Sequence, residues 1–258
     1  MAYKDFFQNR HGQKICVLVE KSLPQKGLAF VMHGLGGFKE QPLIQAVAEA
    51  FLETGFTVVR FDSANTFGES EGNYEKATVT NYYEDLEDVI EWARKQGWYL
   101  EPFVLAGHSF GGFCTAFFAE NHPEKVKALA PISAMVSGKL SMETGYEKEI
   151  VSEWERTGWR EEKSISKPGA IKRLPWSHVA DRLRYDLLPK IANLKMPVLI
   201  VVGEKDKTTP LEHQKVLFEK IAGKKEFHVI KGAHHTFLSE KDCAELKNLF
   251  EIWIQNLN

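Results

Sequence analysis

A regular alternation between two kinds of segment constrains the fold of this chain more than any other feature. Short, continuously apolar runs are followed by longer segments with the apolar spacing of an amphipathic helix. The strand-type runs are 14–20, 28–34, 56–62, 102–109, 126–134, 196–206 and 226–232, and the helical segments are 41–55, 80–97, 111–123, 210–223 and 242–257. Because continuously apolar strands are buried on both faces, the pattern predicts an α/β fold with a mostly parallel central sheet flanked by helices.

One segment, residues 137–190, does not follow this alternation. It is rich in charged and aromatic residues and has no clean helical or strand period. A structureless connection of this length is uncommon inside a compact domain. We therefore expect residues 1–136 and 191–258 to form the core, and residues 137–190 to form an inserted lid or cap subdomain.

The composition is ordinary for a globular chain and argues against several functions. The 258 residues fit one α/β domain, and 33 Lys and Arg against 35 Asp and Glu give a formal net charge of −2. This balance predicts no basic face for nucleic acid. No apolar run approaches the length of a membrane span, so we expect none.

The cysteines and the N-terminus bear on the cellular compartment. Cys16, Cys114 and Cys243 are widely spaced and form no CxxC pair, which argues against a disulfide framework or a zinc site and favours a reducing compartment. The first residues, MAYKDFFQNRHGQK, lack the apolar core and cleavage site of a signal peptide. We expect a cytoplasmic protein that uses no metal and no cofactor.

A candidate nucleophile stands at a predicted strand-to-helix turn. In LAGHSFGG (105–112), Gly107, Ser109 and Gly111 form the pattern G-x-S-x-G. A sharp, strained turn at this point exposes the serine hydroxyl, and small neighbours are needed because strand and helix nearly touch. The start of the following helix also favours negative charge. The alternative is a glycine-rich turn with an incidental serine.

An acid and a base follow in the order that such a turn requires. The strand-type run 196–206 ends in Glu204 and Asp206, and the last strand-type run leads into IKGAHHTF (230–237). On this architecture the chain order is serine, acid, histidine, with the groups at the carboxyl ends of strands. Asp206 is the favoured acid and Glu204 its competitor. Adjacent residues of an extended segment point in opposite directions, so at most one of the two histidines reaches Ser109.

With these motifs in view, nearly the whole chain resembles the α/β-hydrolase superfamily. The resemblance rests on HGLGG (33–37), AGHSFGG (106–112), VVGEKDKTTP (201–210) and IKGAHHTF (230–237), in this order. Family members commonly carry Gly-Ala-Gly-His or Gly-Ala-Asp-His in the last loop. Aligning Gly232 and Ala233 with that pattern implies that His235 is the base, and that His234 occupies the Gly or Asp position.

The same resemblance implies an oxyanion hole and neighbours of the substrate. The backbone N–H groups of Leu35 and Phe110 would bind the oxyanion, and Gly34 and Gly36 would let their loop approach the substrate closely. His108, inside the elbow, is expected beside the substrate or as a packing residue.

Within the superfamily the chain is similar to small cinnamoyl or feruloyl esterases and to monoacylglycerol-lipase-like enzymes. The likeness lies in residues 60–93, where Asp62, Gly68, Ser70 and Gly72 match the common pattern. The first glycine of that pattern is missing and the loop is one residue longer, which implies a different acyl specificity.

The function that this resemblance implies is serine carboxylic-ester hydrolysis. A Ser109–His235–Asp206 triad would form an acyl-enzyme on a small or medium ester, such as a hydroxycinnamoyl or short-chain acyl ester. Alternatives are a peptidase, amidase or thioesterase with the same triad, or a non-catalytic ligand receptor with this fold.

The aromatic residues of the 137–190 segment leave two interpretations open. Trp154, Trp159 and Trp176 line an acyl- or alcohol-binding pocket over Ser109, or they form the core of the insert itself. The basic residues Lys163, Lys167, Lys172 and Arg173 are expected on a solvated face.

Overall fold

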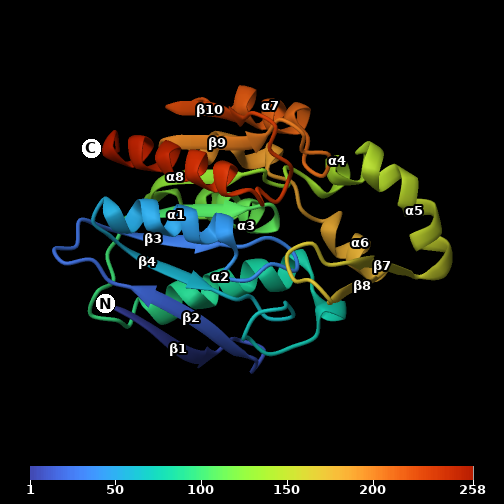
Figure 1. The fold of residues 1–258 in the computed structure, drawn as a ribbon, viewed down its shortest axis with the longest axis horizontal. Coiled ribbons are helices and arrows are strands. Elements are labelled where there is room, and N and C mark those ends of the chain that lie inside the picture. Colours follow the sequence, from blue (N-terminus) through green and yellow to red (C-terminus); the bar gives the residue numbers. More distant parts are fainter. Residues whose placement is uncertain (258) are drawn as a thin grey trace.

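The structure is a computed structural model that describes residues 1–257. Eight strands form one sheet in the order β1-β2-β4-β3-β5-β6-β9-β10 (Figure 1). The strands are β1 (Ala2–Gln8), β2 (Lys14–Glu20), β3 (Gly27–Met32), β4 (Phe56–Phe61), β5 (Phe103–His108), β6 (Val126–Ile132), β9 (Val198–Gly203) and β10 (Lys225–Ile230). The β1–β2 and β2–β4 pairs are antiparallel, and every pair from β4 to β10 is parallel. The expected mostly parallel sheet is confirmed.

Helices cover both faces of the sheet and create two hydrophobic cores. One core lies under α1 (Pro42–Glu53) and α8 (Glu240–Gln255), and the other under α2 (Val79–Ala93), α3 (Phe110–Asn121) and α7 (Leu211–Lys220). Successive strand residues alternate between the two, so that Phe30 packs in one core and Val31 in the other. Burial on both faces explains why these strands are apolar throughout.

The N-terminal strand β1 was not expected from the sequence. It pairs antiparallel with β2 at the edge of the sheet, and its residues alternate between exposed and half-buried. Phe6, for example, is 41% exposed. An edge strand covered on one side only carries no continuous apolar run, so the feature that marks the central strands is missing here.

The 137–190 segment has secondary structure of its own. It contains the helices α4 (Gly138–Met142), α5 (Gly145–Thr157) and α6 (Ser177–Arg182), and the hairpin of β7 (Trp159–Lys163) and β8 (Ile171–Pro175). These elements lie together beside one end of the sheet (Figure 1). Short 3₁₀ helices are η1 (Tyr74–Lys76), η2 (Pro123–Lys125) and η3 (Leu188–Asn193), the last of which begins at the end of this segment.

The two ends of the 137–190 segment, which we call the insert, lie at neighbouring points. The N–H of Gly138 donates to the Tyr185 carbonyl over 2.8 Å, and the N–H of Leu187 donates to the Val136 carbonyl over 3.1 Å. A Cβ atom on Gly138 would lie 1.9 Å from the Arg182 carbonyl oxygen, so only glycine fits at this crossing.

The parallel strands bring their carboxyl ends to one edge of the sheet. The loops that follow β3, β5, β9 and β10 therefore meet at this edge, which is where ligands bind in open α/β sheets.

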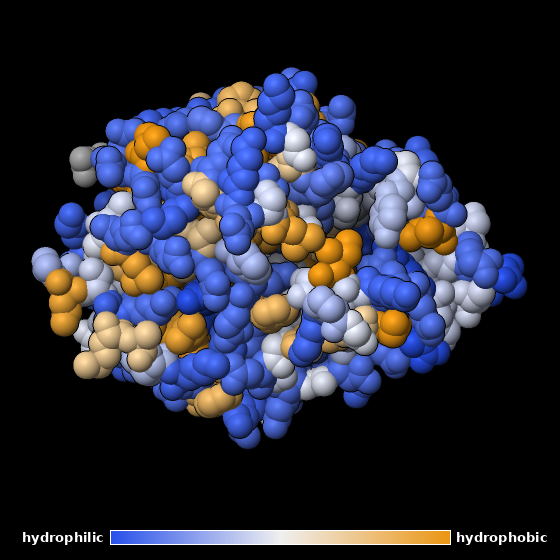
Figure 2. All heavy atoms as spheres, in the orientation of Figure 1, coloured by the Kyte–Doolittle hydropathy of each residue, from blue (hydrophilic) through white to orange (hydrophobic). Residues whose placement is uncertain are grey.

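The helices of the described residues, 1–257, are too short or too polar to cross a membrane. Hydrophilic residues predominate on the face shown in Figure 2, and apolar residues are scattered among them.

A buried acid near the end of α3 couples stability to pH. Glu120 is 1% exposed, and neither carboxylate oxygen has a hydrogen-bond partner among residues 1–257. Burial raises the pKa of Glu120 to about 8. An unfolded chain releases this proton near pH 4.3. The folded state therefore holds a proton that the unfolded state has lost, and stability falls as pH rises between these two values.

Replacing this acid should remove part of the pH dependence. The free energy of unfolding of Glu120→Gln, taken relative to that of the wild type, should be higher at pH 8 than at pH 5.5 by about 1 kcal/mol or more. Urea unfolding followed by circular dichroism at both pH values measures this change. Glu124→Gln, at an exposed position, is the matched control and should show the same pH dependence as the wild type. Parallel curves for the wild type and Glu120→Gln would contradict the argument.

Candidate active site

The turn between β5 and α3 holds Ser109 in a strained conformation. Its backbone has φ 56° and ψ −115°, a region that residues other than glycine rarely adopt. A Cβ atom on Gly107 would lie 2.4 Å from the Gly111 carbonyl oxygen, and one on Gly111 would lie 2.4 Å from the His33 carbonyl oxygen. The two glycines therefore allow strand, helix and neighbouring loop to meet, and the Ser109 side chain emerges from this turn.

Hydrogen bonds link Ser109, His235 and Asp206 in a chain. His235 Nε2 lies 3.0 Å from Ser109 Oγ, and His235 Nδ1 lies 2.8 Å from Asp206 Oδ2. The N–H groups of Thr208 and Thr209 each donate to Asp206 Oδ1 over 2.9 Å. Burial alone would raise the pKa of Asp206, but the neighbouring His235 and the hydrogen bonds outweigh it and hold that pKa well below its usual range. The carboxylate is thus ionised and fixed toward the imidazole.

Of the two adjacent histidines, His235 makes both contacts and His234 makes neither. His234 is exposed and lies along the cavity wall. Glu204, the competing acid, accepts a hydrogen bond from the Gly232 N–H over 2.8 Å instead of facing the imidazole. It therefore braces the loop that carries His235.

A second brace comes from His108. Its Nε2 lies 2.7 Å from the His235 carbonyl oxygen, so this nitrogen carries the proton and donates it. Burial lowers the pKa of His108 to about 3, helped by the neighbouring His235. His108 is therefore neutral, and it lies against the His235 ring at a centroid distance of 4.7 Å. His108 also lines the cavity.

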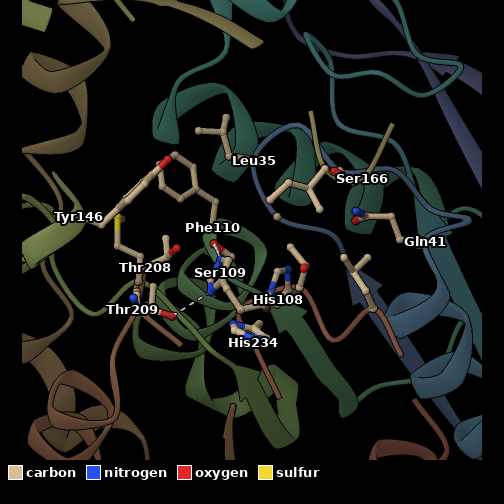
Figure 3. A pocket seen from close by; sticks show the side chains of 18 of the residues that line it. Leu35, Gln41, His108, Ser109, Phe110, Tyr146, Ser166, Thr208, Thr209 and His234 are labelled. Atoms are coloured by element: carbon tan, nitrogen blue, oxygen red, sulfur yellow. Dashed lines mark hydrogen bonds between the residues drawn. The ribbon is translucent and has the colours of Figure 1, made fainter. Parts of the chain in front are cut away.

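Two backbone N–H groups belong to residues that line the cavity with Ser109: Leu35 in the loop after β3, and Phe110 at the start of α3. Figure 3 shows Ser109 between these two residues and His234. Within residues 1–257, neither the Leu35 N–H nor the Phe110 N–H donates a hydrogen bond, so both can receive a ligand oxygen. The buried His33 holds the loop: its Nδ1 donates to the Gly34 carbonyl over 2.8 Å, and its Nε2 accepts from the Ser63 N–H over 3.1 Å.

A cavity of about 810 Å³ opens over these groups. Gly34 lines it, whereas Gly36 turns with φ +66° and donates its N–H to the Tyr82 hydroxyl over 3.1 Å. The insert contributes one wall through Tyr146, Glu147, Arg160, Glu162, Ile165, Ser166, Lys172, Leu174 and Arg182.

The three tryptophans expected at the pocket do not line this cavity. Trp154 is 1% exposed, packs edge to face on Trp176, and donates its Nε1 proton to the Leu174 carbonyl over 3.1 Å. Trp159 lies at the surface with the Arg173 guanidinium over its ring. The pocket interpretation is wrong for these residues, because Trp154 and Trp176 pack against each other within the insert and Trp159 lies on its surface.

The sequence analysis missed the polar wall of the cavity. Lys172 was expected on a solvated face, but its side chain is only 16% exposed and lines the cavity. Its position on β8 explains the error. The insert has little alternating pattern from which one could tell an inward lysine from an outward one. Tyr146, Arg160 and Arg182 were not singled out for the same reason.

The sheet order, the strained serine turn and the Ser–His–Asp hydrogen bonds define a chain of the α/β-hydrolase class. Comparison with known proteins makes this more specific. The chain belongs to the family described as X-Pro dipeptidyl-peptidase (S15 family), whose model matches residues 21–185, more than half of its length. A model described as serine aminopeptidase, S33, matches residues 173–242.

Individual relatives are similar over much of the chain. A 31.7 kDa protein encoded in the traX–finO intergenic region of Escherichia coli is 28% identical over 81% of this chain and 82% of its own. The mitochondrial palmitoyl-protein thioesterase ABHD10 of Bos taurus is 28% identical over 64% of this chain and 52% of its own. The solved structure of Est1E from Butyrivibrio proteoclasticus with bound ferulic acid shares the fold, with a TM-score of 0.78, 20% identity and 98% of both chains covered. The relatives and the fold together make this chain a hydrolase.

The close contact between the serine turn and the end of β3 can be tested by adding one methyl group at residue 111. Gly111→Ala places a Cβ against the His33 and Met32 carbonyls and should lower the free energy of unfolding by about 1–3 kcal/mol. Gly97→Ala is the control, since a Cβ there meets nothing within 4 Å. Denaturant unfolding of both variants measures the difference. Equal stability of the two would mean that the turn tolerates a side chain at residue 111.

Proposed function

We propose that this protein is a serine carboxylic-ester hydrolase in which Ser109, His235 and Asp206 form the catalytic triad. The observation that carries the proposal is the hydrogen-bond chain of 3.0 Å and 2.8 Å that joins the three side chains. The strained backbone of Ser109 supports it, because such strain persists only where the surrounding structure enforces it.

In the proposed reaction, Ser109 Oγ attacks the ester carbonyl carbon while His235 Nε2 takes the hydroxyl proton. The carbonyl oxygen becomes an oxyanion and accepts hydrogen bonds from the N–H groups of Leu35 and Phe110. Asp206 stabilises the imidazolium. The C–O bond of the ester then breaks, and the alcohol leaves with the proton from His235.

The second half of the cycle repeats these steps with water. His235 removes a proton from water, the hydroxide oxygen attacks the acyl-enzyme carbonyl, and Ser109 leaves as the free hydroxyl together with the acid product. None of these steps calls for a metal or cofactor. We also propose that the insert at 137–190 acts as a cap over the cavity, since its residues form one wall.

The substrate is proposed to be a small or medium ester. The cavity of about 810 Å³ fits a ligand of that size. Hydroxycinnamoyl and short-chain acyl esters are the first candidates, because the fold matches that of a protein solved with ferulic acid. We also propose a cytoplasmic location, which the three free cysteines support.

Thioester cleavage is the second candidate function. A relative named as a palmitoyl-protein thioesterase matches 64% of this chain, and the same attack on the carbonyl carbon applies to a thioester. Amide cleavage is a third use of the same groups, which the family descriptions favour. Matched acyl esters, thioesters and anilides, compared by kcat/KM, separate these functions.

A fluorophosphonate probe distinguishes an enzyme from a ligand receptor with this fold. We expect covalent labelling of Ser109 in the wild type, located by peptide mass spectrometry, and none in Ser109→Ala. The same variant should lose about three or more orders of magnitude in kcat on p-nitrophenyl esters, because triad residues act as a unit. An unlabelled but folded wild-type protein would remove the enzyme assignment.

The two histidines give a matched pair for testing the base. His235→Ala should lower kcat about as much as Ser109→Ala, since the proton of Ser109 then has no acceptor. His234→Ala, one residue away and exposed, should keep more than about a tenth of the activity, a loss within the range of indirect effects. Initial rates with a p-nitrophenyl ester measure both. Greater loss in His234→Ala would reverse the assignment.

A further inference from the structure

The wall that the insert gives to the cavity carries a compact group of charges, which we call the insert charge cluster. It consists of Glu147, Arg160, Glu162, Lys172 and Arg182, all of which line the cavity. Three of these side chains are cations and two are carboxylates. The cluster therefore has one positive charge that no acid within it balances.

Arg160 forms ion pairs with both carboxylates of the cluster. Its Nη1 lies 2.9 Å and 3.2 Å from the two oxygens of Glu147, and its Nη2 lies 2.7 Å from Glu162 Oε2. Glu162 also accepts a hydrogen bond from the Tyr146 hydroxyl over 2.9 Å. Because these short, charge-assisted hydrogen bonds already occupy the carboxylate oxygens, other cations are left with weaker contacts to them.

Arg182 is consequently short of partners although it is buried. Its residue is 4% exposed, and its Nε has no hydrogen-bond partner among residues 1–257. Its Nη1 is 3.4 Å from the Met142 sulfur and 3.8 Å from the nearest Glu147 oxygen. Burial lowers the pKa of Arg182 against the opposing effect of Glu147. A buried guanidinium without short oxygen contacts is costly unless a ligand supplies them.

Lys172 is in a similar position. Its ammonium lies 3.9 Å from Glu162 Oε1, and no hydrogen bond from Nζ is found in the described part of the chain. Burial lowers its pKa. Two under-partnered cations thus face the same cavity from neighbouring elements of the insert, α6 and β8.

Both cations lie beside the groups proposed to hold the oxyanion. The Arg182 guanidinium carbon is 5.6 Å from the ring centroid of Phe110. The Lys172 Cε packs against Gly36, where a Cβ atom would lie only 2.9 Å away. Arg182 thus contacts the side chain of one residue proposed to bind the oxyanion, and Lys172 contacts the residue that follows the other, Leu35. An anionic group of a substrate bound at Ser109 would therefore meet them.

The outer part of the cavity carries more positive charge. Exposed lysines contribute to its lining from the loops after β9 and β10 and from the start of α8: Lys205, Lys207, Lys231 and Lys241. Asp242 is the acid that lines the cavity among them. The chain as a whole has a formal net charge of −2, so this concentration of cations is local and attracts anions to the opening.

From this cluster we infer that the substrate is an ester that carries a free carboxylate, bound by Arg182 and Lys172. One unbalanced positive charge matches one carboxylate, and the planar guanidinium suits carboxylate geometry. The inference rests on the proposed ester hydrolysis and narrows its substrate class.

Two pairs of esters test the inference on either side of the scissile bond. Mono-p-nitrophenyl glutarate and p-nitrophenyl valerate differ by a carboxylate in the acyl part. 4-Acetoxybenzoate and its methyl ester differ by a carboxylate in the leaving group. Lys172→Gln and Arg182→Lys should each lose about tenfold more kcat/KM on the carboxylate member of one pair than on its neutral partner, as expected for one lost charge-assisted hydrogen bond.

The matched control is Lys163→Gln, on the exposed face of the same hairpin, which should keep the wild-type ratio for both pairs. Equal losses on charged and neutral esters in both pairs would overturn the inference, while turnover that depends on Ser109 would leave the proposed function standing.

A binding measurement separates the two proposals when catalysis is absent. Calorimetry on Ser109→Ala should show monomethyl glutarate binding about tenfold more tightly than dimethyl glutarate, an advantage that Lys172→Gln removes and Lys163→Gln does not. No such advantage would overturn the inference. Preferential binding of methyl phosphate over monomethyl glutarate, lost in Lys172→Gln, would overturn it in favour of a phosphate-bearing ligand.

Discussion

The close contact between the ends of β3 and β5 and the start of α3 is the constraint on which the rest of the site depends. Gly107 lies opposite Met32 in the parallel pairing, and Gly111 reaches the carbonyls of Met32 and His33. No side chain fits between these backbones at Gly107 or Gly111, and Ser109, between the two glycines, has a positive φ of 56°. The proposed nucleophile and the loop of Leu35 are thus placed by the same contact.

A buried ion pair holds the loops on the β4 side of this contact. Asp62, at the end of β4, accepts hydrogen bonds from both the Lys39 N–H and the Lys39 ammonium over 2.7 Å. Glu69 adds a second carboxylate at 2.7 Å. Cys16, Asp62 and Glu69 are spaced closely enough to bind a metal ion, but the Lys39 ammonium lies among them and supplies the positive charge. This pair joins the loop after β3 to the loop after β4.

The sequence predicted the parts of this molecule where one physical requirement dominates. Burial on both faces makes the central strands apolar, so they could be recognised, and the serine turn admits only small residues at 107 and 111. The edge strand β1 and the insert follow no single requirement. Trp154 and Lys172 could be assigned only once the packing of the insert was known, since the same residue types serve equally well on a surface, in a core or at a pocket.

The way the insert joins the core has a consequence for the engineering of this chain. A backbone hydrogen bond joins Val136 and Leu187, and another joins Gly138 and Tyr185. The two ends of the insert are therefore adjacent and fixed, as in a closed loop. Lengthening such a loop adds closure entropy only slowly, roughly with the logarithm of its length. Added length in this segment should therefore cost the fold little closure entropy, whereas loss of Trp154, Leu174 or Val179 would also remove contacts of the larger hydrophobic core.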